Sequence, residues 1–143
     1  MREIKFRVWD KKLKEMNYLL LEDLCEDDYW YDGETSVWSV LNDCNDKNER
    51  FEIGQYTRLK DKNGVEIYEG DIIDIHQTVN GYNQFVIEYD DYKFSARYYN
   101  QKTREIGSRY NYDLDELFEL NEYEKELEVI GNIYEDKLKE EGK

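Results

Sequence analysis

The chain has 143 residues, a size typical of one domain, and its 14 Tyr, 5 Phe and 3 Trp are more than a disordered chain carries. Its net charge of −15 repels phosphate backbones, which disfavours ordinary nucleic-acid binding. The sequence has no apolar run of membrane-spanning or signal-peptide length, so we expect a cytoplasmic protein in which Cys25 and Cys44 are reduced thiols.

The first third of the chain predicts short strands separated by polar loops. Apolar and polar residues alternate over residues 4–9 and again over 16–20, which predicts an N-terminal hairpin closed by the polar residues between them. The acidic residues 21–36 show no clear period, and residues 37–41 predict another short strand. Residues 42–49 are rich in Asn and Asp, which favours a loop.

Two tight turns are predicted between residues 59 and 75. Asn63 and Gly64 both tolerate positive φ, so this pair predicts a hairpin turn. Gly70 follows six residues after Gly64 and, with Asp71, predicts a sharp bend into the next strand. We expect the Asp71 side chain to accept hydrogen bonds from nearby backbone N–H groups. Together the turns favour the corner of a small barrel over a catalytic loop.

The rest of the chain predicts further strands and one short helix. An Asn-Gly pair within residues 78–84 predicts a turn between the strand that follows Gly70 and an alternating strand near residues 85–89, and a further alternating strand is predicted near residues 94–98. Helical spacing of apolar residues, with Asp113 as N-cap, predicts a helix near residues 113–118. A last strand over 127–135 then completes a mainly β fold with minor α, either a small sandwich or a barrel.

The residues that could carry catalysis form no recognisable motif. The single histidine, His76, stands without a nucleophile motif and is expected to be a strand-end residue. The acidic residues 25–34 do not follow the ligand offsets of a calcium loop, and no glycine-rich phosphate loop occurs. We therefore expect a protein that is not an enzyme and that uses no metal or cofactor.

Two binding hypotheses follow from the charge and aromatic patterns. In the first, a protein partner contacts Tyr29, Trp30 and Tyr31 in the acidic loop, and the acidic surface either only keeps the chain soluble or competes for a basic, DNA-binding protein. In the second, nucleic acid contacts a basic and aromatic strip at residues 93–110, through Lys93, Arg97, Tyr99, Lys102, Arg104 and Arg109.

Each binding hypothesis has a simpler alternative. Residues 93–110 could equally form a β-hairpin whose basic face pairs with acidic neighbours, and the acidic loop could simply be solvated. We also expect a homo-oligomer, because short barrels expose strand edges. No membrane partner is expected.

Three blocks of sequence, residues 4–16, 55–73 and 129–135, resemble the YopX family of phage and prophage proteins. The chain departs from the family pattern at Arg58, where a small glycine is usual. The resemblance implies an SH3-like small β-barrel, encoded by a phage or prophage and present in the cytoplasm of the host cell. It implies no established activity, and therefore no catalytic residues; the partner would be a host or phage protein.

The matched blocks are expected to share a structural role within one domain of residues 1–143. We divide this domain into N-terminal strands and acidic loops (1–50), a barrel core (51–135) and a charged tail (136–143). The expected structural motif comprises Trp9, Asp61, Gly64, Ile67, Tyr68, Glu69, Gly70, Asp71, Ile130, Gly131 and Asn132. The first and last blocks should meet across the sheet, with a core of Trp9, Tyr56, Leu59, Ile67, Tyr68, Ile73, Ile130 and Ile133.

Overall fold

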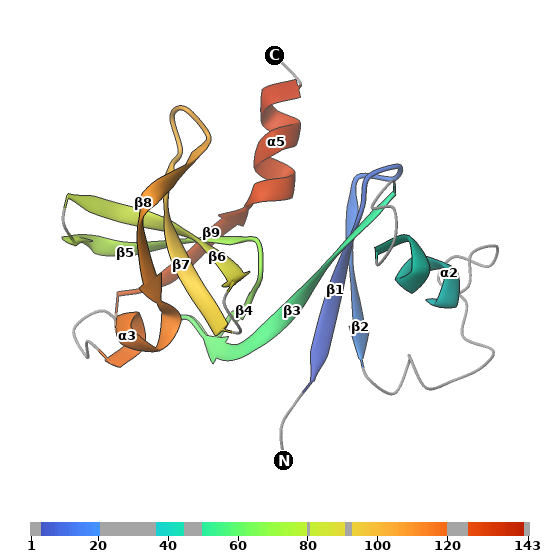
Figure 1. The fold of residues 1–143 in the computed structure, drawn as a ribbon, viewed down its shortest axis with the longest axis horizontal. Helices are drawn as coiled ribbons and strands as arrows, with labels where there is room; N and C mark the ends of the chain where they lie inside the picture. Colours follow the sequence, from blue (N-terminus) through green and yellow to red (C-terminus); the bar gives the residue numbers. More distant parts are fainter. Residues whose placement is uncertain are drawn as a thin grey trace. The chain divides into compact units, whose positions relative to one another are not determined.

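A computed structural model describes residues 4–20, 37–44, 50–79, 81–90, 93–119 and 126–141. The strands form a four-stranded sheet of order β2-β1-β3-β4 and a curled five-stranded sheet of order β8-β7-β6-β5-β9 (Figure 1). Short helices complete a mainly β fold, which confirms the predicted class of a small SH3-like β-barrel with an N-terminal hairpin and a short helix in its C-terminal half. The chain divides into two compact units, residues 1–56 and 57–143.

The first unit is built on the predicted N-terminal hairpin. Strands β1 (Lys5–Asp10) and β2 (Glu15–Leu20) pair antiparallel, and β1 also pairs with the start of β3 (Phe51–Lys60). One face of this sheet buries a cluster of Val8, Leu19, Val40 and Phe51. The opposite face of β1 carries Arg7 and Trp9, and both residues are buried as well.

Residues 37–41 are not a strand, as the sequence predicted, but part of helix α2 (Val37–Asn42). A short apolar run does not distinguish a strand from one buried helical turn by its periodicity. Packing decides here, since Val40 is fully buried in the cluster of the first unit.

The connection between β1 and β2 is held by a buried carboxylate. Asp10 is fully buried; its Oδ1 accepts from the backbone N–H of Lys12 (2.9 Å) and of Leu13 (3.1 Å). The Arg50 guanidinium donates to both Asp10 oxygens, at 3.1 and 2.8 Å. A bidentate pair of this kind compensates the cost of burying the charge and ties the hairpin to the start of β3.

The second unit packs two helices against strands of the curled sheet. Its elements are the rest of β3, β4 (Glu66–Tyr68), β5 (Asp71–Val79), β6 (Tyr82–Asp90), β7 (Lys93–Asn100), β8 (Glu105–Asp113), α3 (Leu114–Glu119), β9 (Glu128–Asn132) and α5 (Ile133–Glu141). Its core comprises Ile67, Ile73, Ile75, Phe85, Ile87, Ala96, Leu114, Leu117 and Leu127. Helix α3 confirms the short helix that the sequence predicted.

Both predicted glycine turns are present and take the left-handed backbone that favours glycine. Gly64 has φ +81° and closes the turn between β3 and β4; Gly70 has φ +88°. The Gly70 N–H donates to the Ile87 carbonyl (2.8 Å), and its own carbonyl accepts from the Ile133 N–H (2.9 Å). A Cβ at Gly70 would lie 2.8 Å from the Tyr134 ring. This glycine therefore forms a corner where three segments meet.

Two carboxylates complete the corner. Asp61 Oδ1 accepts from the N–H groups of Asn63 (2.8 Å) and Val65 (2.9 Å), while its Oδ2 accepts from Val129 (2.9 Å) on β9. Asp71 accepts from the Tyr68 N–H at 2.8 Å, which confirms the capping predicted for it. The middle and last matched blocks are thus joined through a side chain as well as through the sheet.

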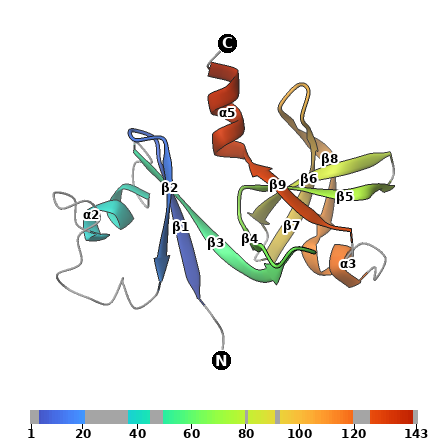
Figure 2. The same ribbon diagram turned by 180° about the vertical axis from the view of Figure 1, so that it is seen from behind.

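The C-terminal end differs from the prediction. Strand β9 stops at Asn132 and helix α5 runs directly on from it, where the sequence suggested a longer strand and a charged tail (Figure 2). Asn132 Oδ1 accepts from the Glu135 N–H at 2.9 Å, so Asn132 is the N-cap of α5. The pattern of Asn followed three residues later by Glu is a helix-start signal that the strand assignment overlooked.

Two expectations about the core are wrong. Ile130 is 39% exposed and lies at the irregularity in the pairing of β9 with β5, whereas Trp9, Tyr56, Ile67, Tyr68 and Ile73 are buried and Leu59 and Ile133 are partly buried. The first and last blocks do not meet across one sheet: β1 belongs to the four-stranded sheet and β9 to the five-stranded one. Arg58, where the family pattern has glycine, has φ +70°.

Candidate functional site

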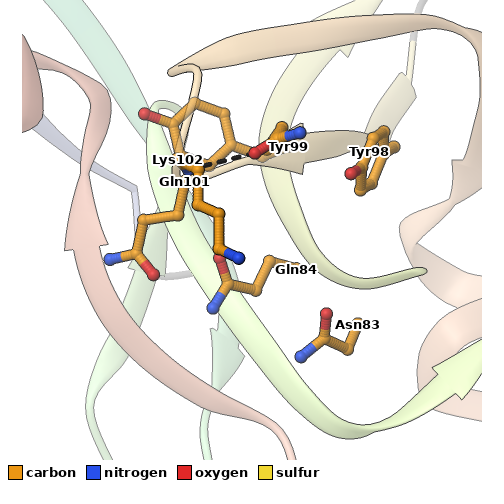
Figure 3. Close-up of a pocket in the computed structure, with 7 residues that line it drawn as sticks. Asn83, Gln84, Tyr98, Tyr99, Gln101 and Lys102 are labelled. Atoms are coloured by element: carbon orange, nitrogen blue, oxygen red, sulfur yellow. Dashed lines mark hydrogen bonds between the residues drawn. The ribbon is translucent and has the colours of Figure 1, made fainter.

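An open groove lies along β6 and β7 in the second unit. It has a volume of about 340 Å³ and is lined by Asn83, Gln84, Tyr98, Tyr99, Asn100, Gln101 and Lys102. Figure 3 shows Asn83 and Gln84 on one side, with the Lys102 side chain reaching towards Gln84 from the turn after β7. The lining offers amides, phenols and one ammonium group, and no carboxylate.

The turn between β7 and β8 presents its side chains because Asn100 fixes its backbone. The Asn100 side-chain carbonyl accepts from the N–H groups of Lys102 (3.0 Å) and Thr103 (3.2 Å), and the Arg104 N–H donates to the Asn100 backbone carbonyl at 2.6 Å. Gln101 and Lys102 are exposed at the tip of this turn. An Asn whose side chain bonds its own turn is a common way to fix such a loop.

Tyr98 is held between the two strands that flank β7. Its ring lies 3.8 Å from that of Tyr82 on β6, centroid to centroid, and a Cβ on Gly107 of β8 would come within 2.8 Å of Tyr98 Cδ1. The absence of a side chain at Gly107 therefore makes room for the ring. With neighbours on both strands, Tyr98 has little ring face left on which a ligand could stack.

Tyr99 connects the hairpin to helix α5. It is 4% exposed, and its hydroxyl donates to the Asp136 carboxylate. Arg104 Nε lies 3.6 Å from Asp136 Oδ2 in the same cluster. A second, smaller cavity of about 70 Å³ adjoins Asp136 and is lined also by Gln101, Asn132 and Lys139.

The basic strip predicted at residues 93–110 is largely paired with carboxylates. Lys93 lies 2.6 Å from Asp113, Arg97 lies 3.2 Å from Glu88, and Arg104 faces Asp136. These contacts match the simpler alternative of a β-hairpin whose basic face meets acidic neighbours. Tyr99 is buried and therefore has no face available to a base. Arg109 belongs to β8, but its side chain lies outside the described residues.

Lys102 differs from Lys93, Arg97 and Arg104. Within the described ranges its ammonium group has no ion-pair partner, and the residue is exposed at the mouth of the groove. The aromatic residues proposed for protein contact, Tyr29, Trp30 and Tyr31, lie outside the described residues.

His76 lies within β5 rather than at its end, at an irregularity in the pairing with β6. Its backbone has φ +55°, and its N–H donates to Asp74 Oδ1 at 2.7 Å. The ring Nε2 is 2.9 Å from Glu128 Oε2 on β9, and Lys62 Nζ is 3.4 Å from the same oxygen. The hydrogen bond from His76, followed by the charge of Lys62, lowers the pKa of Glu128.

Three further observations concern the described residues only. No three His, Cys, Asp or Glu side chains among them are grouped so as to hold a metal ion. None of their helices combines the length and apolarity that crossing a membrane requires. Burial, and then the charges of Asp43 and Glu52, raise the pKa of the Cys44 thiol to about 11.

Sequence reasoning missed most of the groove. It singled out Lys102 and Tyr99 for their charge and aromatic character, but not the amide side chains Asn83, Gln84, Asn100 and Gln101. A signal was present, because polar amides flank two predicted turns at the ends of adjacent strands, a place where loops collect functional groups. The pairing of β6 with β7 brings them together.

Comparisons with known proteins agree with the architecture. No curated protein matches the sequence. The crystal structure of protein EF1440 from Enterococcus faecalis is similar in fold, with a TM-score of 0.51 and 21% identity over 96% of this chain and 97% of that chain. The family model described as YopX protein matches residues 5–138, which is nearly the whole chain. The chain therefore belongs to the YopX family.

Proposed function

We propose that this YopX-family chain is a non-enzymatic accessory protein, encoded by a phage or prophage, that acts in the host cytoplasm by binding another protein. The observation that carries the proposal is the groove along β6 and β7, whose lining consists of hydrogen-bonding groups without a carboxylate. In a chain with 35 acidic residues out of 143, such a lining sets the groove apart from the rest of the surface. Amide side chains both donate and accept hydrogen bonds, as a polypeptide backbone does.

Nucleic-acid binding through residues 93–110 is the second candidate, and the exposed ammonium of Lys102 favours it. Three other cations of the strip already face carboxylates, and the net charge of −15 opposes a polyanion. If this candidate were correct, single-stranded DNA or RNA would bind at 50 mM salt and dissociate as salt is raised. Absence of binding at 50 mM salt would remove it.

Site-specific photocrosslinking tests the leading proposal. A photoreactive benzophenone amino acid replaces Gln101 at the mouth of the groove, and in a matched control it replaces Lys12, which is exposed in the first unit. We expect protein adducts at position 101 that are missing at position 12. Equal adducts at both positions, or none at position 101, would contradict binding at the groove. Adducts that disappear on nuclease treatment would support the second candidate instead.

We also propose that copies of the chain associate through β2, the outer strand of the four-stranded sheet. No strand in the described part of the chain pairs with its outer edge, and Tyr18 on β2 is 60% exposed. The edge strand of a sheet can pair with a strand of a second copy. Light scattering should give a multiple of 17.5 kDa for the wild type and a smaller mass for Tyr18→Lys. A wild-type mass of one chain at high concentration would refute the association.

A further inference from the structure

We infer that the groove takes a short, extended peptide that carries a carboxylate, with Lys102 contacting the carboxylate and the amides of Gln84 and Asn100 contacting the peptide main chain. This inference rests on the proposed function and names the chemistry of the partner segment.

The lining of the groove carries a single charge. Lys102 is the one ionised side chain among the seven lining residues. Two carboxylates outside the lining accept hydrogen bonds from it: Asp74 accepts from Gln84 Nε2 at 3.4 Å, and Asp136 accepts from the Tyr99 hydroxyl. The one charge on the lining itself is therefore positive, and its complement is one negative group.

Existing hydrogen bonds decide which group of the Gln84 and Asn100 side-chain amides is left for a ligand. Gln84 uses its NH₂ group on Asp74, which leaves its side-chain carbonyl as an acceptor. Asn100 uses its side-chain carbonyl within its own turn, which leaves its NH₂ group as a donor. Gln84 and Asn100 thus present one acceptor and one donor from adjacent strands. An extended peptide presents N–H and C=O groups along one edge and matches both.

The groove suits a peptide better than other ligands that are rich in hydrogen-bonding groups. Nucleobases and sugars gain much of their affinity from an exposed aromatic face, but Tyr98 is packed by Tyr82 and Gly107, and Tyr99 is buried. The net charge of −15 also repels the many negative charges of a polyanion, whereas a short peptide with one carboxylate brings a single negative charge. The groove volume of about 340 Å³ suits only a few residues.

The experiment follows the side-chain NH₂ signals of the groove in ¹⁵N-resolved NMR spectra of the full chain. Three probes are titrated: Ac-Ala-Ala-Glu-Ala-Ala-NH₂, its Gln counterpart, and Ac-Ala-Ala-Ala-Ala with a free C-terminal carboxylate. We expect the signals of Gln84 and Asn100 to shift, and at least one carboxylate probe to bind about fivefold more tightly than the Gln probe, as one exposed ion pair provides. Whichever carboxylate probe binds more tightly identifies the source, a side chain or a chain end.

Two variants make the readout specific. Lys102→Gln should remove the preference for the carboxylate while the groove signals still shift, and Lys12→Gln, in the first unit, should keep the preference. Both positions are exposed, so folding should be unaffected. Equal binding of all three probes to the wild type would overturn the inference but leave a protein-binding groove in place. If none of the three probes shifts the groove signals, the inference would also be overturned. Photocrosslinking at position 101 would then test the proposed function independently.

Discussion

Gly70 combines two requirements that Gly64, Gly81, Gly107 and Gly131 meet singly or not at all. Its φ of +88° disfavours any side chain, and a Cβ would lie 2.8 Å from the Tyr134 ring. Gly64 shares the positive φ but has open space around it, and Gly131 has neither constraint. We expect Gly131→Val to change stability little and Gly64→Val to cost about 1–2 kcal/mol. Gly70→Val should cost more than either, because steric overlap is added to the backbone strain.

Urea unfolding of the three variants measures this order. The comparison separates backbone strain from overlap, since the same valine is placed at all three positions. A Gly70→Val protein as stable as the wild type would refute the corner at residue 70. Equal losses at Gly64 and Gly70 would show instead that Tyr134 moves aside at no cost.

Cys44 illustrates how burial and like charge suppress the reactivity of a thiol. Its pKa is raised from 9.0 to about 11, and only the thiolate is nucleophilic. A change of that size lowers the thiolate fraction at pH 8 by about a hundredfold. In a Cys25→Ser chain, we expect iodoacetamide to react with Cys44 far more slowly than with glutathione, and denaturant to abolish the difference. Comparable rates in the folded protein would contradict the burial.

Among the elements, the pairing of β5 with β9 carries a pH dependence through Glu128. His76 and then Lys62 lower the pKa of Glu128 below its ordinary value of 4.5, so the folded protein favours the carboxylate. The resulting stabilisation is present above pH 4.5 and is lost as pH falls through the lower, folded-state pKa. We expect Glu128→Gln to unfold at less urea than wild type at pH 7, with a difference that shrinks below pH 4.5.

Glu116→Gln serves as a control, because Glu116 is exposed on α3. Its unfolding midpoint should follow that of the wild type at every pH. A difference between Glu128→Gln and wild type that stays constant down to pH 3 would show that the charge of Glu128 does not contribute.

The elements that the sequence predicted correctly are those whose signals are local. Gly64 and Gly81 take positive φ at a turn, and the alternation of the flanking strands is a property of a few neighbouring residues. Helix α2 was predicted as a strand because its packing around Val40 depends on residues distant in sequence. Helix α5 was missed although Asn132 and Glu135 marked its start, because the preceding alternation was extended too far.

The groove was harder to predict than the fold for a physical reason. A strip of cations can be seen in the sequence, but their counterions cannot: Asp113, Glu88 and Asp136 are 20, 9 and 32 residues from the cations they meet. Gly107 is also several residues away from Tyr98 in the sequence, so the sequence alone does not show that the two residues are in contact. What a side chain can offer a ligand depends on these partners, so residue type alone overstated the basic strip and overlooked the amides.

For the molecule as a whole, β3 is the element that both compact units share. Its first half pairs with β1, where Gln55 lies opposite Phe6, and its second half belongs with β4, where the Thr57 hydroxyl donates to the Ile67 carbonyl at 2.7 Å. The division at residue 56 therefore falls inside one continuous strand. If either unit unfolded, β3 would lose the neighbouring strand that holds it extended on that side of residue 56. The prediction of a single domain accordingly becomes a prediction of one cooperative unfolding transition.

The positions of the tryptophans make this prediction testable without labels. Trp9, Trp30 and Trp38 are the three in the chain, and all precede residue 57, so tryptophan fluorescence reports the first unit. Far-UV circular dichroism is weighted towards the second unit, which contains most of the strands. We expect the two signals to share one midpoint, and Gly70→Val, a change in the second unit, to lower the fluorescence midpoint too. A fluorescence midpoint unmoved by Gly70→Val would mean that the units unfold independently and that the chain comprises two domains.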